Sequence, residues 1–291
     1  MIIDAHLHLW KKQKGFVDGL PVYDLGGGKS QFGNEIRQML PPYMEDGYNS
    51  VERLIANMDY AGVNGCVVTQ EYIDGNQNTY LLEAKHKYPD RIKICSLYEE
   101  TDDYPLEGFN GIKICAGRLS KKKLSDLLPV FQAAGSAGMF ISIDLAEGAS
   151  QVEELRELIN KCPEVKVAIG HFGMAGRNGF EEQIKLACYP NVYIESGGIT
   201  WLFHKEFYPY PSAVEAILRA RDICGMEKLM WGSDYPRTMT AITYPMSFDF
   251  IQKSDRLTSR EKEQFLWENA KEFYGFTDLE KIPYVKNMVE E

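Results

Sequence analysis

The stretch MIIDAHLHLW, residues 1–10, places two histidines inside an apolar run. His6 and His8 are two residues apart, so in a β-strand their side chains point to the same face. Two imidazoles on one face are costly to bury unless each finds a partner. Neutral imidazole is the most common metal ligand, and two from one strand supply half of a site. The stretch therefore predicts a first strand that ends in a functional site.

Seven further short runs are apolar and rich in β-branched residues, as expected of strands buried on both faces. Amphipathic segments that stop at glycine or proline separate most of them, which is typical of helices. The eight candidate strands are residues 2–9, 65–70, 91–98, 111–115, 139–144, 166–172, 191–196 and 228–234. The candidate helices include residues 51–62, 78–89, 152–163 and 213–225.

Eight strands that alternate with helices in a chain of 291 residues are typical of a (β/α)8 barrel of the TIM type. The alternative is a doubly wound open sheet, whose first turn is often rich in glycine. The turn after the first strand is not rich in glycine, so the barrel is favoured. Because no composition shift marks a boundary, we expect residues 1–291 to form a single α/β domain.

The segment from Lys11 to Ser50 has no clear strand or helix pattern, and we expect a long loop after the first strand. Loops of this length in compact domains are usually functional lids or disordered segments. Trp10 stands at the start of the segment, and it is followed by Phe16, Tyr23, Phe32, Tyr43 and Tyr48. This aromatic content favours a packed lid over disorder.

Residues 258–275 have the pattern of a closing helix. Thr258 and Glu261 have the spacing of a capping box, and Gly275 is a helix stop. We expect the charged tail that follows, through Glu291, to lie on the surface.

The overall composition limits the possible binding partners and the cellular location of the protein. A formal net charge of -10 argues against a nucleic-acid backbone or an anionic membrane as the main partner. The N-terminus lacks the order of a signal peptide, and no apolar run approaches membrane-spanning length. Six cysteines without a CxxC pair are interpreted as buried thiols of a reducing compartment, which predicts a cytoplasmic protein. We therefore expect a small-molecule substrate, and the sequence predicts no oligomeric state.

Polar residues also stand at the ends of other candidate strands. Asp144 ends the fifth strand, His171 the sixth and Asp234 the eighth. In (β/α)8 barrels the catalytic groups come from several strand ends on one face. We therefore expect these three side chains to meet His6 and His8 around one pocket.

Five motifs, DAHLHLW, GIKI, IGHFG, WGSDYP and ENAKEFYG, resemble in order and spacing the amidohydrolase superfamily. The resemblance covers nearly the whole chain. It is closest to the amidohydrolase-related branch that includes sugar-acid lactonases and 2-pyrone-4,6-dicarboxylate lactonase. H-x-H alone is a weak signal, but its combination with G-H-F-G and G-S-D-x-P is specific. The resemblance implies a hydrolase that opens a lactone or a related cyclic ester, with a sugar acid as the candidate substrate.

The resemblance also implies roles for individual residues. His6 and His8 match metal ligands, Asp234 matches the aspartate that takes a proton from water, and His171 would hold or polarise the carbonyl. The chain departs from the family at Asp144, where many members have a metal-binding histidine, which puts a two-metal site in doubt. One divalent metal, with zinc as the first choice, could be held by His6, His8, Asp234 and Asp144. A metal-free site remains the alternative, with the histidines as donors to the developing oxyanion.

Six residues near strand ends are candidates for substrate binding. Arginine binds carboxylates in two-point fashion, and arginines follow the fourth, sixth and eighth strands, which favours a substrate with a carboxylate or many hydroxyls. Lysine in an apolar barrel strand predicts a position at the barrel mouth, with the acid of the seventh strand as its partner. His86 lies in a helical pattern and is expected on a solvated face. The six candidates are Lys113, Arg118, Arg177, Glu195, His204 and Arg237.

Three functions remain open. The first is the lactone hydrolase, and the second is a metal-dependent decarboxylase of the same superfamily. The third is a barrel retained as a non-catalytic binding protein, which the absence of the fifth-strand histidine favours. The presence of His6, His8, His171 and Asp234 counts against the third function.

Overall fold

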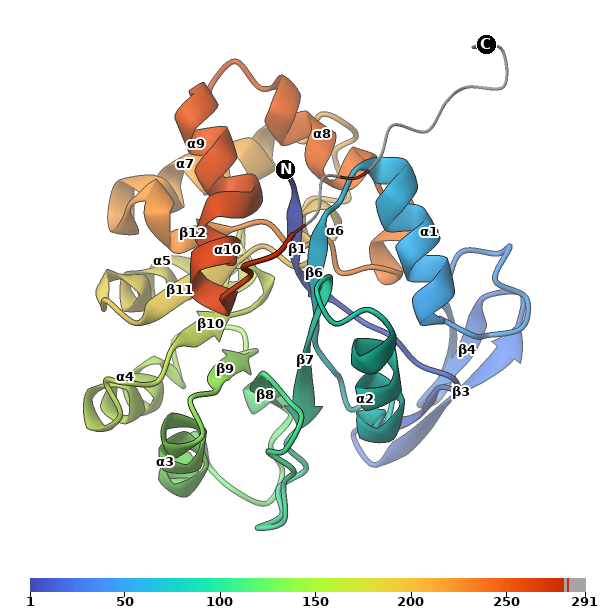
Figure 1. Cartoon of the computed structure of the whole chain (residues 1–291), viewed down its shortest axis with the longest axis horizontal. Coiled ribbons are helices and arrows are strands. Elements are labelled where there is room, and N and C mark those ends of the chain that lie inside the picture. Colours follow the sequence, from blue (N-terminus) through green and yellow to red (C-terminus); the bar gives the residue numbers. More distant parts are fainter. Residues whose placement is uncertain (280–281, 283–291) are drawn as a thin grey trace.

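Eight parallel strands curl around a common axis at the centre of Figure 1. Backbone bonds from Ala5 N to Trp231 O and from Asp234 N to His6 O, both 2.9 Å, join the last strand to the first. The strands are β1 Ile3–Leu7, β6 Gly65–Val68, β7 Ile92–Leu97, β8 Gly111–Ile114, β9 Phe140–Ile143, β10 Val167–Ile169, β11 Val192–Glu195 and β12 Leu229–Met230. The computed structural model, which describes residues 1–279 and 282, thus confirms the predicted (β/α)8 barrel and all eight strands.

Helices surround the strands, as Figure 1 shows. They are α1 Val51–Ala61, α2 Asn78–Lys87, α3 Leu128–Ser136, α4 Val152–Lys161, α5 Phe180–Lys185, α6 Ile199–Leu202, α7 Pro211–Cys224, α8 Met246–Lys253, α9 Ser259–Glu263 and α10 Asn269–Tyr274. The predicted helix at 51–62 is confirmed, because Ser50 caps its start and Gly62 ends it with φ 73°. Among the described residues, none of the helices combines the length and apolar character that a bilayer span needs.

The closing segment also follows its prediction. The Thr258 hydroxyl accepts a bond from Glu261 N, and the Glu261 carboxylate accepts one from Thr258 N, so the capping box is present. One π-helical turn, Gln264–Glu268, joins α9 to α10, and Gly275 ends α10 with φ 68°. The predicted surface position of the charged tail lies almost entirely outside the described residues.

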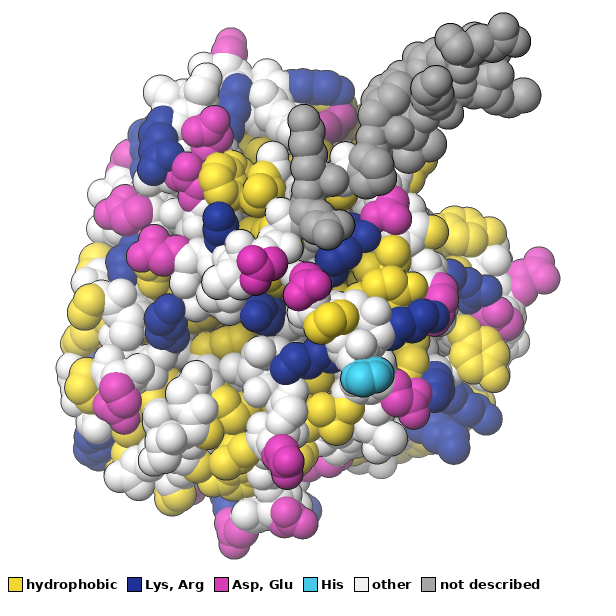
Figure 2. Space-filling view, in the orientation of Figure 1, with side chains coloured by type: hydrophobic (Ala, Val, Ile, Leu, Met, Phe, Trp, Pro, Cys, Tyr) yellow, Lys and Arg dark blue, Asp and Glu magenta, His cyan; other side chains and the backbone are white. Residues whose placement is uncertain are grey.

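The segment after β1 is the main departure from the sequence prediction. It forms a four-stranded antiparallel sheet, which we call the lid sheet, and the expectation of an irregular loop is therefore wrong. Its strands are β2 Lys14–Val17, β3 Leu20–Gly26, β4 Lys29–Phe32 and β5 Glu35–Gln38. In Figure 2, hydrophobic side chains lie exposed among charged ones in the region of β3 and β4. The aromatic content correctly indicated order, since Val22 and Met39 of this segment are buried against Ile73 of the barrel.

The core has two main parts. The larger part lies between the strands and the surrounding helices. A smaller cluster includes the small or slender side chains Ala5, Cys95 and Ala168 of three strands, together with Phe140 and the aromatic residues of α10. In this cluster Phe140 packs against Tyr274, with the ring centroids 4.8 Å apart. The helix α10 therefore packs against one end of the barrel.

The cysteines partly follow their prediction. All six lie in the described part of the chain and are free thiols. The three in strand-like runs, Cys66, Cys95 and Cys115, are buried, as is Cys162. The expectation of burial is wrong for Cys188, which is exposed.

We predict that Phe140→Ala destabilises the fold by about 3–5 kcal/mol, because it leaves a cavity between the barrel and α10. Urea unfolding followed by circular dichroism measures the change. Tyr60→Ala is the control, since the side chain of Tyr60 is 86% exposed. Equal midpoints for the two variants would contradict this account of the core.

Candidate active site

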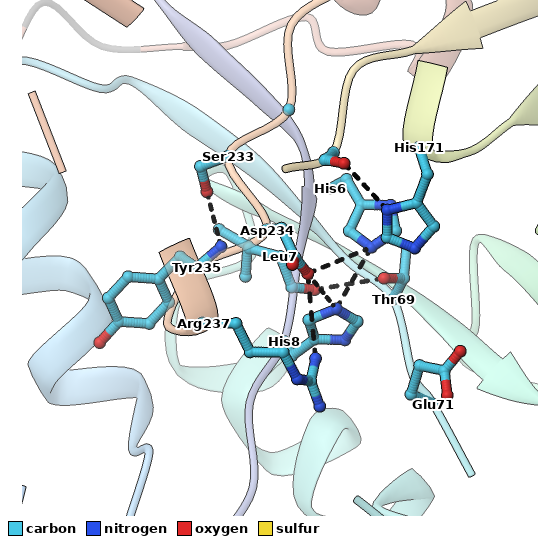
Figure 3. A network of polar contacts seen from close by, with 12 residues as sticks. His6, Leu7, His8, Thr69, Glu71, His171, Ser233, Asp234, Tyr235 and Arg237 are labelled. Carbon is cyan, nitrogen blue, oxygen red and sulfur yellow. Dashed lines mark hydrogen bonds and ion pairs between the residues drawn. The ribbon is translucent and has the colours of Figure 1, made fainter. Parts of the chain in front are cut away.

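His6 and His8 are both buried at the end of β1. Their Nε2 atoms lie 3.2 Å apart, and His8 Nε2 lies 2.9 Å from Asp234 Oδ1. His6 Nε2 lies 3.9 Å from the same oxygen. Figure 3 shows the three side chains pointing toward one another. The predicted meeting of the first and last strands at one site is therefore present.

The acid that precedes the histidines has a different environment. Asp4 is buried and accepts bonds from Ser233 N, the Ser233 hydroxyl and the Tyr244 hydroxyl. The pairing of β1 with β6 shifts register between Asp4 and Leu7, and such irregularities re-aim side chains. Burial raises the pKa of Asp4 to about 6 despite these bonds. Asp4 therefore fixes the segment that carries Asp234 and does not take part in the histidine cluster.

Glu195 orients His6. The imidazole donates from Nδ1 to Glu195 Oε1 over 2.5 Å, and both side chains are buried. A proton on Nδ1 leaves the lone pair of the neutral ring on Nε2, which faces His8 and Asp234. Carboxylates commonly play this role behind metal-binding histidines. Glu195 sits at the end of β11, as predicted, but its partner is His6.

Lys113 pairs with Asp144 and not with Glu195 as the sequence analysis expected. The distance from Lys113 Nζ to Asp144 Oδ1 is 2.6 Å, and Lys113 is fully buried. Lys113 is paired with Ser142 between β8 and β9, so Asp144 lies two residues further along the adjacent strand. Burial opposes the charge, but Lys113 and His171 hold the pKa of Asp144 well below its usual value.

Asp234 is an ionised carboxylate on a constrained backbone. Its φ of 58° lies in the left-handed region, which is uncommon for a residue with a side chain. Trp201 Nε1 donates to Asp234 Oδ2 over 2.9 Å and so fixes the carboxylate from the side opposite His8. Burial opposes ionisation, but the bond from His8 and the charges of Arg237 and His171 keep the pKa of Asp234 far below its usual value.

His171 follows β10 and contacts the same cluster. Its Nδ1 donates to Gly197 O over 2.9 Å, its Nε2 lies 3.5 Å from Asp144 Oδ2, and its ring centroid is 4.8 Å from that of His6. Burial lowers the pKa of His171, but the carboxylate of Asp144 outweighs it, and the pKa rises to about 10. His171 is therefore a charged hydrogen-bond donor, and its backbone φ of 51° is also left-handed.

These groups open into a cavity of about 530 Å³. His8, Asp144, His171 and Asp234 line it together with Arg118 and Arg237. Arg118 Nε lies 3.1 Å from Glu71 Oε2, and Arg237 Nη2 lies 2.6 Å from Asp74. Two other candidates, Arg177 and His204, are exposed and are not part of the described lining.

Sequence reasoning missed part of the cavity wall. Trp201 belongs to the short helix α6 after β11, and Glu71 follows β6, so both could have been found as polar or aromatic residues beyond a strand end. Most of the other missed residues belong to the lid sheet or directly follow it, and a lone arginine in a segment without a clear pattern gave no signal. The missed lining residues include Phe32, Arg37, Gln38, Met39, Glu71, Cys115 and Trp201.

The donor atoms around His6 fit one divalent metal. His6 Nε2, His8 Nε2 and Asp234 Oδ1 converge within 3.9 Å of one another. Such a set of two imidazoles and one carboxylate is typical of catalytic zinc sites that keep an open position. Asp144 lies outside this set and groups instead with Glu195 and His6 or with Glu71 and Cys115. Its oxygens face Lys113 and His171, so the described geometry brings together three of the four predicted ligands.

The geometry defines a class of protein, namely a (β/α)8 barrel with a histidine–aspartate cluster and a charged histidine at the C-terminal ends of its strands. The amidohydrolase family model matches residues 3–276. The chain therefore belongs to the amidohydrolase family and is an enzyme of that superfamily.

Several solved structures share this fold. A probable 2-pyrone-4,6-dicarboxylic acid hydrolase from Acinetobacter baumannii, with citric acid bound, matches 94% of this chain and 99% of its own, with TM-score 0.69 and 20% identity. A similar hydrolase from Pseudomonas putida has TM-score 0.68, 19% identity and coverage of 94% and 97%. A Burkholderia multivorans amidohydrolase with bound zinc has TM-score 0.66, 14% identity and coverage of 94% and 99%. None of the curated proteins compared with the chain matches it.

We predict that Glu195→Gln lowers the affinity for added Zn²⁺ by roughly 10- to 100-fold, because the neutral amide no longer polarises His6. Titration against a chelator of known affinity measures the change. Glu227→Gln is the matched control, because Glu227 is exposed and precedes β12, at the opposite end of that strand from Asp234. Equal zinc affinities in both variants would show that Glu195 does not act through His6.

The charge on His171 predicts a pH dependence of stability in protein stripped of metal by a chelator. The pKa rises from 6.5 to about 10 on folding, so protonation stabilises the fold fully below pH 6.5. That stabilisation is lost as the pH rises through about 10. Urea unfolding from pH 6 to pH 10 should show a steeper loss in wild type than in His171→Gln. Parallel curves would contradict the assignment of a charged imidazole.

Proposed function

We propose that this enzyme hydrolyses a lactone or a related cyclic ester, with a sugar acid or a similar polar ring as substrate. The observation that carries the proposal is the position of Asp234. Its carboxylate lines the cavity, lies 2.9 Å from His8 and is held by Trp201. A fixed, ionised carboxylate beside imidazoles is suited to take a proton from water.

Three residues would divide the chemistry. Asp234 accepts the proton of the attacking water, and Trp201 keeps the carboxylate turned toward His8. His171 donates a hydrogen bond to the carbonyl oxygen, where negative charge develops. Its Nδ1 is engaged by Gly197 O, so Nε2, which faces Asp144 and the cavity, is the atom available for this bond. After the ring opens, Asp234 can return its proton to the leaving oxygen.

We propose that His6, His8 and Asp234 hold one divalent metal, with zinc as the first choice. Zinc held there would supply a coordinated water with a pKa near neutrality, which is a ready nucleophile. The donor set supports this proposal, and the Burkholderia multivorans relative has bound zinc. The alternative is a metal-free site, in which His6 and His8 would each carry a proton on Nε2 to act as donors, and Asp234 alone activates water. A lactone is an activated ester, so this route needs little further assistance.

The cavity wall supports a substrate with carboxylate or hydroxyl groups. Arg118 follows β8 and Arg237 follows β12, and both line the cavity. Arg37 lines it from the lid sheet. The structural relatives are described as hydrolases of a pyrone dicarboxylic acid, and one has citric acid bound. Arg177 and His204 are not part of this proposal, because both lie outside the lining. The free cysteines support a reducing, cytoplasmic location.

We predict that Asp234→Asn lowers lactone turnover by at least about 10³-fold while the fold is retained, because the amide cannot accept the proton from water. A panel of sugar-acid and pyrone lactones, followed by proton release at constant pH, measures turnover with and without added zinc. Asp255→Asn is the control, because Asp255 is an exposed loop acid that is not among the residues lining the cavity. Wild-type rates in Asp234→Asn would remove this residue as the base.

The same panel separates the competing functions. Ring opening with proton release supports the hydrolase. Release of CO₂ from the corresponding acids, without ring opening, would establish the decarboxylase instead. Tight binding with neither product would indicate a binding protein. Metal analysis of protein purified without chelators decides between the two versions of the site.

A further inference from the structure

Asp74 lies in the loop between β6 and α2 and is buried between the cavity wall and the lid sheet. Both of its carboxylate oxygens lie 2.6 Å from Arg237 Nη2. Its Oδ2 also faces His8 Nδ1 at 3.9 Å. Asp74 was not among the residues expected from the sequence, and no step of the proposed chemistry uses it.

The same carboxylate holds the lid sheet. Gln13, just before β2, donates from Nε2 to Asp74 Oδ1 over 3.0 Å, and the hydroxyl of Ser30 in β4 donates to Gln13 Oε1 over 2.6 Å. Gln13 and Ser30 are both buried. The backbone reinforces the contact, since Lys14 N donates to Asp74 O over 3.2 Å. Gly75 is required there, because a Cβ at its φ of 74° would lie 2.1 Å from Lys14 O.

The bond to Asp74 limits what Arg237 can do. Arginine grips a carboxylate in two-point fashion either through Nε and one terminal nitrogen or through both terminal nitrogens. Nη2 of Arg237 already donates to Asp74, while Nη1 lies 3.9 Å from Asp234 Oδ1. Arg237 Nε is buried and has no hydrogen-bond partner in the described part of the chain. Arg237 is therefore a cation fixed beside Asp234 with at most single-point contacts left for a substrate.

We propose that Asp74 is a positioning residue that couples the lid sheet to the catalytic carboxylate: it fixes Arg237 beside Asp234 and anchors Ser30 through Gln13. The described contacts lead from β4 to the active site by this route, Ser30 to Gln13 to Asp74 to Arg237. A substitution at Arg237 must then change the stability of the lid sheet, and a substitution at Ser30 must change the cavity that binds substrate. This inference rests on the proposed function only where turnover is measured.

Hydrogen exchange of the lid sheet tests the coupling without any substrate. Asp74→Asn and Ser30→Ala should each speed amide exchange in residues 14–38 by roughly tenfold, because a buried bond in the chain is lost. Arg237→Lys should also speed exchange there, although residue 237 has no hydrogen bond or ion pair to the lid sheet among the described residues. Glu99→Gln is the matched control, since Glu99 is an exposed acid that bonds Asn76 of the same loop. Normal exchange in Arg237→Lys, or in Asp74→Asn, overturns the proposal.

Turnover of a lactone hydrolysed by wild type supplies the second test. Ser30→Ala should raise KM about tenfold with kcat retained, because the lid sheet forms part of the cavity wall. Asp74→Asn should raise KM and also lower kcat, since it frees Arg237 as well. A merely structural Asp74 would lower the active fraction, so kcat would fall with KM unchanged, and that result overturns the proposal. If wild type hydrolyses no lactone, the proposed function fails, whereas the exchange measurements still decide the role of Asp74.

Discussion

The hydrogen bond between His6 and Glu195 fixes the orientation of the imidazole at the centre of the site. It is buried and short, and it fixes the proton of His6 on Nδ1, so the lone pair on Nε2 faces His8 and Asp234. The two side chains come from β1 and β11, with β12 and its continuation between them. Gly232 makes this approach possible, because a Cβ there would lie 2.8 Å from His6 Cβ and 3.0 Å from Glu195 Oε2. The closed barrel is therefore a precondition of the donor set.

Charge balance explains why so many ionisable groups can be buried together. A buried carboxylate without a partner is costly, and Asp144 and Asp234 are both buried. In the structure, Lys113 compensates the charge of Asp144, whereas Asp234 lies beside His6 and His8. Repulsion between the two acids is thus no argument for a metal ion. The case for one metal depends on the donor geometry at His6, His8 and Asp234 alone.

The sequence predicted the barrel and the meeting of its strand ends for a physical reason. Each barrel strand is buried on both faces and is therefore a continuous apolar run, and parallel strands bring their ends to one face. The sequence analysis missed the lid sheet because its strands are largely exposed and carry no continuous apolar run. Its two-residue hairpin turns, Asp18-Gly19 and Gly33-Asn34, were the available signal. Partners such as Lys113 and Asp144 depend on strand register, and loop residues such as Trp201 depend on packing, so neither could be read from spacing.

The cavity arginines argue for a substrate that is polar but not strongly anionic. Arg118 faces Glu71, Arg237 faces Asp74, and Arg37 of the lid sheet lies 3.0 Å from Glu35. A substrate carboxylate must compete with each of these acids for its arginine, and only the surplus over the broken pair contributes to affinity. Hydroxyl groups can use the remaining N–H donors and the carboxylate acceptors at the same time, without breaking a pair. These pairs support the proposal of a lactone with several hydroxyls over that of a multiply charged acid.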